Sequence, residues 1–83
     1  MDVKYIRTRD DKIIVFSMLF NHSDFKSFKP ISAGFIRIRT YEDSVDRFEV
    51  TCICYGESIT LDLKSIPEED SELARKQILG NDY

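Results

Sequence analysis

The sequence predicts a small α+β domain in which five mostly antiparallel strands form a curved sheet and one helix ends the chain. Strand-like runs separated by short polar turns and a helical pattern confined to the C-terminal end predict this fold. Only one linker, residues 19–30, is long enough for a helical crossover between parallel strands. A small, partly closed barrel with an appended helix is the alternative. A chain of 83 residues has room for one domain, over residues 1–83.

The first two strands are expected at residues 3–8 and 13–18. Both segments are rich in β-branched and aromatic residues, which favour an extended backbone. Between them, Asp10 and Asp11 favour a tight turn, because their short carboxylates bond to nearby backbone amides. The two strands therefore form a hairpin.

Residues 21–30 mix polar turn-forming residues with two phenylalanines. Phe25 and Phe28 are three residues apart, which fits one helical turn that seals the end of the core. Asn21 or Ser23 would cap such a turn. An irregular loop is the alternative.

Three further strands are expected over residues 31–40, 47–55 and 58–63. In the first of them, Gly34 marks a bulge or a close approach of another backbone segment. The last two are expected to form a second hairpin through a turn at Gly56.

Side chains alternate in two of these strands, so the two faces can be assigned. In the segment 31–40, the residues expected on one face are Phe35, Arg37 and Arg39. In the segment 47–55, one face carries Phe48, Val50, Cys52 and Cys54, and the other carries Glu49, Thr51, Ile53 and Tyr55.

A helix is expected over residues 66–79. Ser65 and Glu68 fit a capping box, and Pro67 is tolerated in the first turn because its missing amide hydrogen would have no partner there. Acidic residues crowd the start and basic residues follow late, as the helix dipole favours. Gly80 then supplies a left-handed end. The apolar stripe is narrow, so the helix must dock on the sheet.

Composition excludes several classes of protein. The chain is 42% hydrophobic and 33% charged with a net charge of −3, so it is neither disordered nor strongly polyionic. No run approaches the roughly 18–20 apolar residues that span a bilayer, so no membrane association is expected. The polar N-terminus does not resemble a signal peptide, and a cytoplasmic location is the expectation.

Chemistry-bearing residues are few. Cys52 and Cys54 lie on one face of a strand and are expected to be reduced, buried hydrophobes. A zinc site would need two more ligands, and His22 is the only histidine, so no metal and no cofactor are expected. His22, Ser23 and Asp24 are consecutive, whereas a catalytic triad is assembled from separate parts of a chain. A non-enzymatic role is therefore predicted.

A basic sheet face is the candidate nucleic-acid site. Residues 1–40 carry eight basic and four acidic side chains, whereas residues 41–83 carry four basic and eleven acidic ones. If the first and third strands lie close together, their cations share a face with aromatic rings, as in small barrels that bind single strands. The residues of this candidate site are Lys4, Arg7, Arg9, Arg37 and Arg39. A solvated face neutralised by acidic side chains is the alternative.

The acidic start of the helix is the candidate protein-binding site, with Glu69 and Glu72 as its residues. Such a surface engages a basic groove on another protein. Helix capping and solubility explain the same charges. Exposed sheet edges offer a second route to a partner, with a homodimer as the simplest form.

The sequence therefore predicts a non-enzymatic module that binds another protein, with nucleic-acid binding as the alternative. In its small and unadorned character the chain is similar in style to small proteins of bacteriophages and mobile elements. That likeness assigns no role to any residue.

Overall fold

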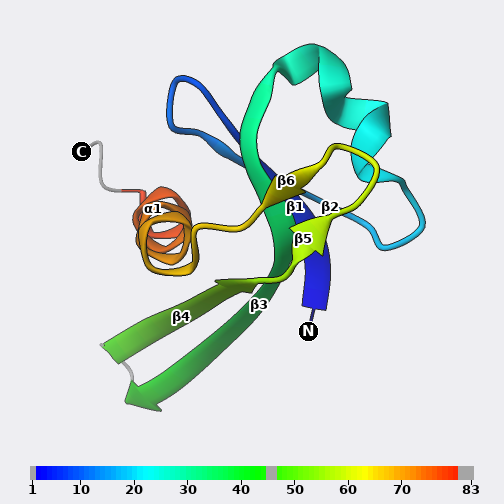
Figure 1. Cartoon of the computed structure of the whole chain (residues 1–83). Helices are drawn as coiled ribbons and strands as arrows, with labels where there is room; N and C mark the ends of the chain where they lie inside the picture. Colours follow the sequence, from blue (N-terminus) through cyan, green and yellow to red (C-terminus); the bar gives the residue numbers. More distant parts are fainter. Residues whose placement is uncertain (1, 45–46, 81–83) are drawn as a thin grey trace.

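The computed structural model describes residues 2–44 and 47–80 and has an α+β fold, as predicted (Figure 1). Four strands form the main sheet, and two short strands, a 3-10 helix and an α-helix complete the described chain. In chain order the elements are β1 (Asp2–Thr8), β2 (Ile13–Phe16), η1 (His22–Phe28), β3 (Pro30–Ser44), β4 (Arg47–Tyr55), β5 (Glu57–Ser58), β6 (Leu63–Lys64) and α1 (Pro67–Leu79).

The main sheet is antiparallel, with the strand order β2-β1-β3-β4, and β5 and β6 pair with each other as a separate two-stranded sheet. The prediction of one five-stranded sheet is therefore wrong. The two outer strands, β2 and β4, do not pair with each other, so the sheet is open and forms no closed barrel.

The predicted strand over residues 58–63 is wrong for a local reason. Its middle, residues 59–62, forms a turn in which the amide of Asp62 donates to the carbonyl of Ile59 at 3.2 Å. Asp62 has a φ of 54°, which a strand cannot accommodate. The predicted hairpin between residues 47–55 and 58–63 is replaced by the hairpin of β3 and β4.

Gly34 on β3 lies beside the end of β4, where the backbone of Tyr55 and Gly56 crosses it. The expected close backbone approach is confirmed. A Cβ atom at this position would lie 2.4 Å from the carbonyl oxygen of Tyr55. Only glycine leaves room for that crossing. The crossing ends the pairing of β3 with β4 at Phe35 and Tyr55, and the chain then turns into the small β5–β6 hairpin.

The sheet separates two hydrophobic clusters. On one face, α1 packs with Leu73 and Ala74 against side chains of all four strands. On the other face, η1 and the β5–β6 hairpin cover one half of the sheet, with Phe25, Leu61 and Leu63 against the second cluster. The buried members of the α1 cluster are Tyr5, Ile13, Ile36, Val50, Cys52, Cys54 and Ala74, and those of the second are Ile6, Phe16 and Ala33.

The segment after β2 forms the helical turn that the phenylalanine spacing predicts. Phe25 stacks on Phe16, with ring centroids 4.0 Å apart. The amide of Asn21, at the N-cap of η1, donates to the Asp24 carboxylate at 3.0 Å. Asp24 thus caps the turn and has a structural role.

The helix begins differently from the prediction. Its N-cap is Ile66, and the expected capping box of Ser65 and Glu68 is wrong, because the Ser65 amide donates to the carbonyl of Gly56 at 3.0 Å. The Ile66 amide instead donates to Asp70 at 3.0 Å. Gly80 ends the helix with a φ of 66°, as predicted.

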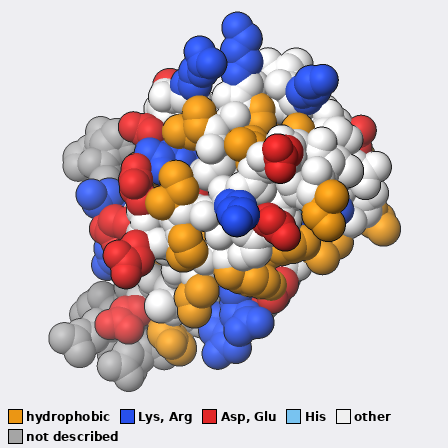
Figure 2. Space-filling view, viewed as in Figure 1, with side chains coloured by type: hydrophobic (Ala, Val, Ile, Leu, Met, Phe, Trp, Pro, Cys, Tyr) orange, Lys and Arg blue, Asp and Glu red, His pale blue; other side chains and the backbone are white. Residues whose placement is uncertain are grey.

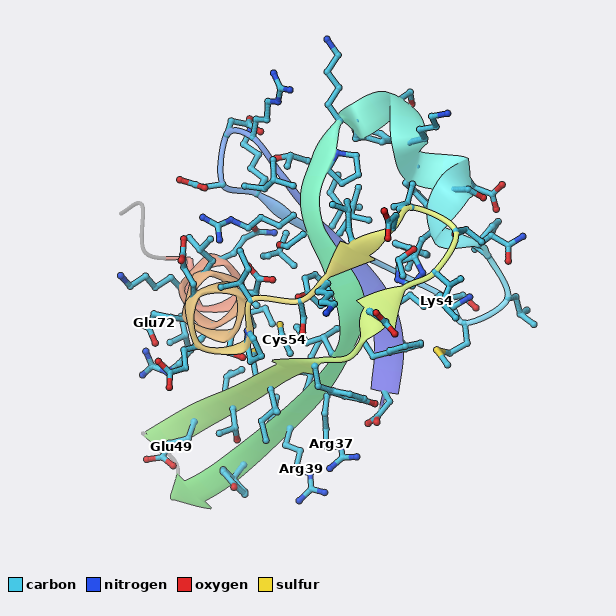
Figure 3. All side chains as sticks on the ribbon, in the orientation of Figure 1. Lys4, Arg37, Arg39, Glu49, Cys54 and Glu72 are labelled. Atoms are coloured by element: carbon cyan, nitrogen blue, oxygen red, sulfur yellow. The ribbon has the colours of Figure 1, made fainter. Side chains whose placement is uncertain are left out.

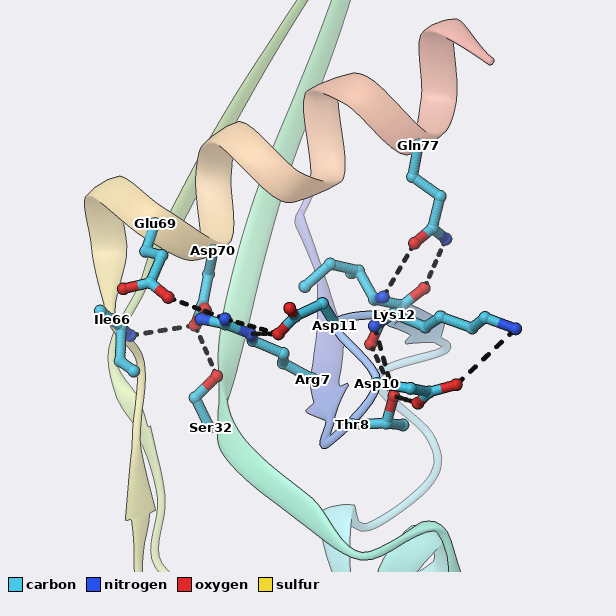
Figure 4. A network of polar contacts seen from close by, with 11 residues as sticks. Arg7, Thr8, Asp10, Asp11, Lys12, Ser32, Ile66, Glu69, Asp70 and Gln77 are labelled. Carbon is cyan, nitrogen blue, oxygen red and sulfur yellow. Dashed lines mark hydrogen bonds and ion pairs between the residues drawn. The ribbon is translucent and has the colours of Figure 1, made fainter. Parts of the chain in front are cut away.

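Two side chains of α1 bond to the backbone of the two outer strands. The Cys54 amide on β4 donates to the Ser71 hydroxyl at 2.8 Å. On β2, the Gln77 amide group accepts from the Ile13 N–H at 2.9 Å and donates to the Ile13 carbonyl at 2.7 Å (Figure 4). The helix therefore crosses the sheet and blocks part of each edge against pairing with another strand. No helix among residues 2–44 and 47–80 has the length and apolar character needed to cross a membrane.

Candidate functional site

One half of the sheet face opposite α1 is left uncovered by the described elements. We call it the open face. The strand register places four pairs of side chains on it: Phe35 with Tyr55, Arg37 with Ile53, Arg39 with Thr51, and Tyr41 with Glu49. Figure 1 shows β3 and β4 running together past α1 as a two-stranded ribbon, and Figure 3 shows Arg37 and Arg39 extending from it away from the helix. The predicted assignment of side chains to the two faces is confirmed for the described side chains.

Arg37 is held in the middle of the open face. Its guanidinium bonds to the Asp2 carboxylate, with Nε 3.0 Å from Oδ1, and lies 5.9 Å from the centroid of the Tyr55 ring. Tyr55 also donates its hydroxyl proton to Asp2. The hydrogen bonds from Arg37 and Tyr55 lower the pKa of Asp2 to about 2. Arg37 is therefore neutralised and fixed, and Phe35 stacks beside Tyr55 with ring centroids 5.7 Å apart.

A shallow hollow of about 150 Å³ lies beyond Arg37 on the ribbon. It combines a cation with exposed apolar surface, since Tyr41 is 54% and Ile53 51% exposed. Arg39 contacts no carboxylate among the residues that the structure describes. The residues that line the hollow are Arg37, Arg39, Tyr41, Thr51 and Ile53. Figure 2 shows basic side chains gathered at the lower edge of this view, beside a run of hydrophobic ones.

A second hollow, of about 390 Å³, adjoins the other end of the open face. Phe35 and the ring of His22 form part of its lining, and Lys4 stands at its side. Its rim includes Ile59, which is 87% exposed. The residues that line this hollow are Lys4, Asn21, His22, Phe35, Gly56, Glu57, Ser58, Ile59 and Thr60.

Lys4, Arg37 and Arg39, three of the five basic residues proposed from the sequence, lie on the open-face side of the sheet. The register places Lys4 opposite Phe35, and its ammonium donates to the carbonyl of Phe20 at 2.7 Å. The single basic face expected from the sequence is nevertheless not formed.

Arg7 lies on the other face of the sheet, buried beneath α1. It donates to Asp70 at 3.1 Å and contacts Glu69 and Asp11 at 2.7 Å each (Figure 4). The β1 residue opposite Arg37 is Asp2, so these two side chains share a face. Arg7 follows Asp2 by five residues, an odd number, and therefore points to the other face. Arg7 therefore binds the acidic start of the helix and is not available to a ligand.

Arg9 follows β1 in an exposed turn, at the opposite end of the strand from Asp2 and Arg37. Of the two proposed acidic residues, Glu69 is engaged by Arg7, whereas Glu72 is exposed on α1 and lies 3.9 Å from Arg75 and 4.0 Å from Lys76. Both acidic side chains thus lie within reach of basic residues of the same chain. Asp70, which lies between them in the sequence, is fully buried.

Tyr41 and Ile53 on the open face are not among the site residues predicted from the sequence. Tyr41 lies one residue beyond the strand expected over residues 31–40 and is followed by Glu42 and Asp43. The available signal was the alternation of β4, which put Ile53 among polar residues on a face away from the core. A single exposed apolar residue is ordinary, but exposed apolar residues that gather into one patch, as Ile53 and Tyr41 do around the hollow, mark an interaction surface.

The histidine and the two cysteines, residue types that often act in catalysis, are buried in the folded chain. His22 is buried, with its Nε2 2.8 Å from the carbonyl oxygen of Gly34. Cys52 and Cys54 are free and buried, as predicted, and burial raises the pKa of the Cys54 thiol to about 11. Such a thiol is a poor nucleophile. The described residues contain no group of three or more His, Cys, Asp or Glu side chains arranged to hold a metal ion.

Comparisons with models of protein families, with curated proteins and with solved structures found no match to this chain.

Proposed function

We propose that the protein is a non-enzymatic binding module that recognises another protein through its open face. The observation that carries the proposal is the exposure of Tyr41 and Ile53 beside Arg37 and Arg39 on a sheet face that no described element covers. Tyrosine and arginine are enriched in protein interfaces, where they form the residues that contribute most to affinity. Free Cys52 and Cys54 fit a cytoplasmic location, where thiols stay reduced.

For an electrostatic reason, the open face is a better candidate for the protein-binding surface than the acidic start of the helix. Glu69 is already paired with Arg7, and Glu72 lies within reach of two basic residues of its own helix. Such pairs weaken the field that an acidic surface presents to a basic partner. The open face, in contrast, offers apolar area together with a cation.

Nucleic-acid binding remains the alternative, because Lys4, Arg37 and Arg39 share one side of the sheet with aromatic rings. The charge balance argues against it. Arg37 is neutralised by Asp2, and Glu49 lies on the same face. Phosphate binding depends on several uncompensated cations, and two carboxylates on the face reduce it.

A pull-down from the lysate of the native host, with and without nuclease, tests the proposal. The tagged wild type is compared with Ile53→Asp, which places a charge on the open face, and with Ile78→Asp, which changes an exposed isoleucine on α1 as a matched control. A partner that survives nuclease, is lost with Ile53→Asp and is kept with Ile78→Asp supports the proposal. A partner that nuclease removes supports nucleic-acid binding. A protein partner that Ile53→Asp still captures contradicts binding through the open face.

A further inference from the structure

We infer that the open face binds an extended acidic segment of its partner, with two carboxylates four residues apart and an apolar side chain between them. In this arrangement one carboxylate pairs with Lys4 and the other with Arg39. The apolar side chain lies midway between the two cations, over the exposed Ile53 opposite Arg37. The inference rests on the proposed function and specifies the partner's chemistry.

The spacing comes from the strand register. Lys4 is opposite Phe35, and Arg39 is four residues further along β3. At about 3.3 Å per residue, the two cations are separated by roughly 13 Å along the strands. In an extended peptide the side chains at positions i, i+2 and i+4 share one side and span the same length. A partner strand therefore presents two acidic residues and one apolar residue at matching positions.

The charges of the open face favour this occupant locally. Arg39 has no carboxylate contact within the described part of the chain, and the Lys4 ammonium donates a hydrogen bond to the neutral carbonyl group of Phe20. Among the described residues, neither cation is neutralised by a carboxylate, so both can pair with an acidic ligand. Arg37, between them, is already paired with Asp2 and holds the Tyr55 ring in place. The centre of the face, where Ile53 lies opposite the neutralised Arg37, is thus uncharged and partly apolar, with a cation on either side.

A single-stranded nucleic acid fits this arrangement less well. Bases bind by stacking on an open ring face. Here Tyr55 is flanked by Phe35 and by the Arg37 guanidinium, and Phe35 also meets the edge of His22 with centroids 5.8 Å apart. A phosphate at the level of Arg37 would be repelled by the Asp2 carboxylate, whereas the proposed peptide places its uncharged residue there. The apolar side chain of a peptide needs only contact with the exposed Ile53.

Selection from a phage-displayed library of random dodecapeptides tests the inference. The wild-type chain is expected to enrich peptides with Asp or Glu at i and i+4 and an apolar residue at i+2. A synthetic peptide of that pattern is expected to bind Arg39→Glu and Lys4→Glu at least about tenfold more weakly than the wild type. Arg9→Glu, which reverses an exposed cation far from the open face, serves as the control and should bind like the wild type.

Charge exchange makes the test specific. Replacing one acidic residue of the peptide by Lys should weaken binding to the wild type and restore it to Arg39→Glu or to Lys4→Glu, according to the position changed. Enrichment of no motif, of a motif without paired acids, or of peptides insensitive to both reversals would overturn the inference. So would tighter binding of oligothymidylate than of the selected peptide. Because the pull-down with Ile53→Asp does not depend on peptide sequence, it would show separately whether the open face still binds a folded partner.

Discussion

Arg7 of β1 and Asp70 of α1 form a buried ion pair, with 3.1 Å between Nη1 and Oδ1. Asp70 also accepts hydrogen bonds from Tyr5, Ser32 and the Ile66 amide, so every donor of this cluster converges on one carboxylate. The cluster joins β1, β3 and the first turn of α1. It therefore fixes how the helix docks on the sheet.

Replacement of that carboxylate should destabilise the fold strongly. Asp70→Asn removes the charge that faces the buried guanidinium of Arg7, and we expect the free energy of unfolding to fall by about 3 kcal/mol. Urea denaturation measures the change. Glu72→Gln, an exposed acidic residue on the same helix, should change stability by less than about 0.5 kcal/mol. Equal effects of the two substitutions would show that the cluster does not hold the helix.

Stability should decline in alkaline solution because of a buried thiol. Burial raises the pKa of Cys54 from the ordinary 9.0 to about 11, so between these values the unfolded chain loses its proton while the folded chain keeps it. The free energy of unfolding therefore falls as the pH rises from 9 towards 11. Burial also raises the pKa of Tyr5, which adds to the decline above its ordinary value of 10.0.

Urea denaturation across this pH range measures the decline, and Cys54→Ala separates the two groups. The variant should have a shallower decline just above pH 9, because the contribution of Cys54 is removed while that of Cys52, whose pKa burial also raises, remains. A wild-type stability independent of pH in this range would contradict the buried state of the thiol.

The contact of Gln77 with the β2 edge should be measurable at a single amide. Gln77→Ala removes both hydrogen bonds to Ile13, and a loss of about 1–2 kcal/mol of stability is expected. Hydrogen exchange at the Ile13 amide should accelerate, because its partner is lost. Lys76→Ala, the neighbouring exposed position, should leave this amide unchanged. Slow exchange at Ile13 in Gln77→Ala would mean that another group protects the edge.

Gly34 should not tolerate a side chain. In Gly34→Ala the new methyl group would lie 2.4 Å from the Tyr55 carbonyl oxygen, which belongs to the backbone and cannot rotate away. We expect a loss of about 2–3 kcal/mol in the free energy of unfolding. Thermal or urea denaturation checks this against Thr51→Ala on the exposed side of β4. A Gly34→Ala variant as stable as the wild type would exclude the close crossing.

Local patterns in the sequence predicted much of the fold. The alternation along β4 identified its buried and exposed faces, and the left-handed end of α1 followed from Gly80. The failure over residues 58–63 arose because the apolar residues Ile59, Leu61 and Leu63 alternate as in a strand, and this alternation does not reveal the local turn in which Asp62 has a positive φ.

The candidate site was harder to predict than the strands, because it depends on register. Arg7 and Arg37 lie on strands that do pair, but a shift of one residue moves every side chain to the other face. The sequence does not specify that shift. Nor does it reveal that Asp70, within a run of exposed acidic residues, turns inward to meet Arg7.

The central claim, that the open face binds a protein, is tested most directly by site-specific photo-crosslinking. A photoreactive phenylalanine derivative replaces Tyr41 on the open face or, as the control, Ile78 on α1, and the chain is expressed in its native host before irradiation. The account predicts that Tyr41 is crosslinked to one protein, identified by mass spectrometry, and that Ile78 is not. Crosslinks to nucleic acid from Tyr41, or the same protein captured equally at Ile78, would contradict it.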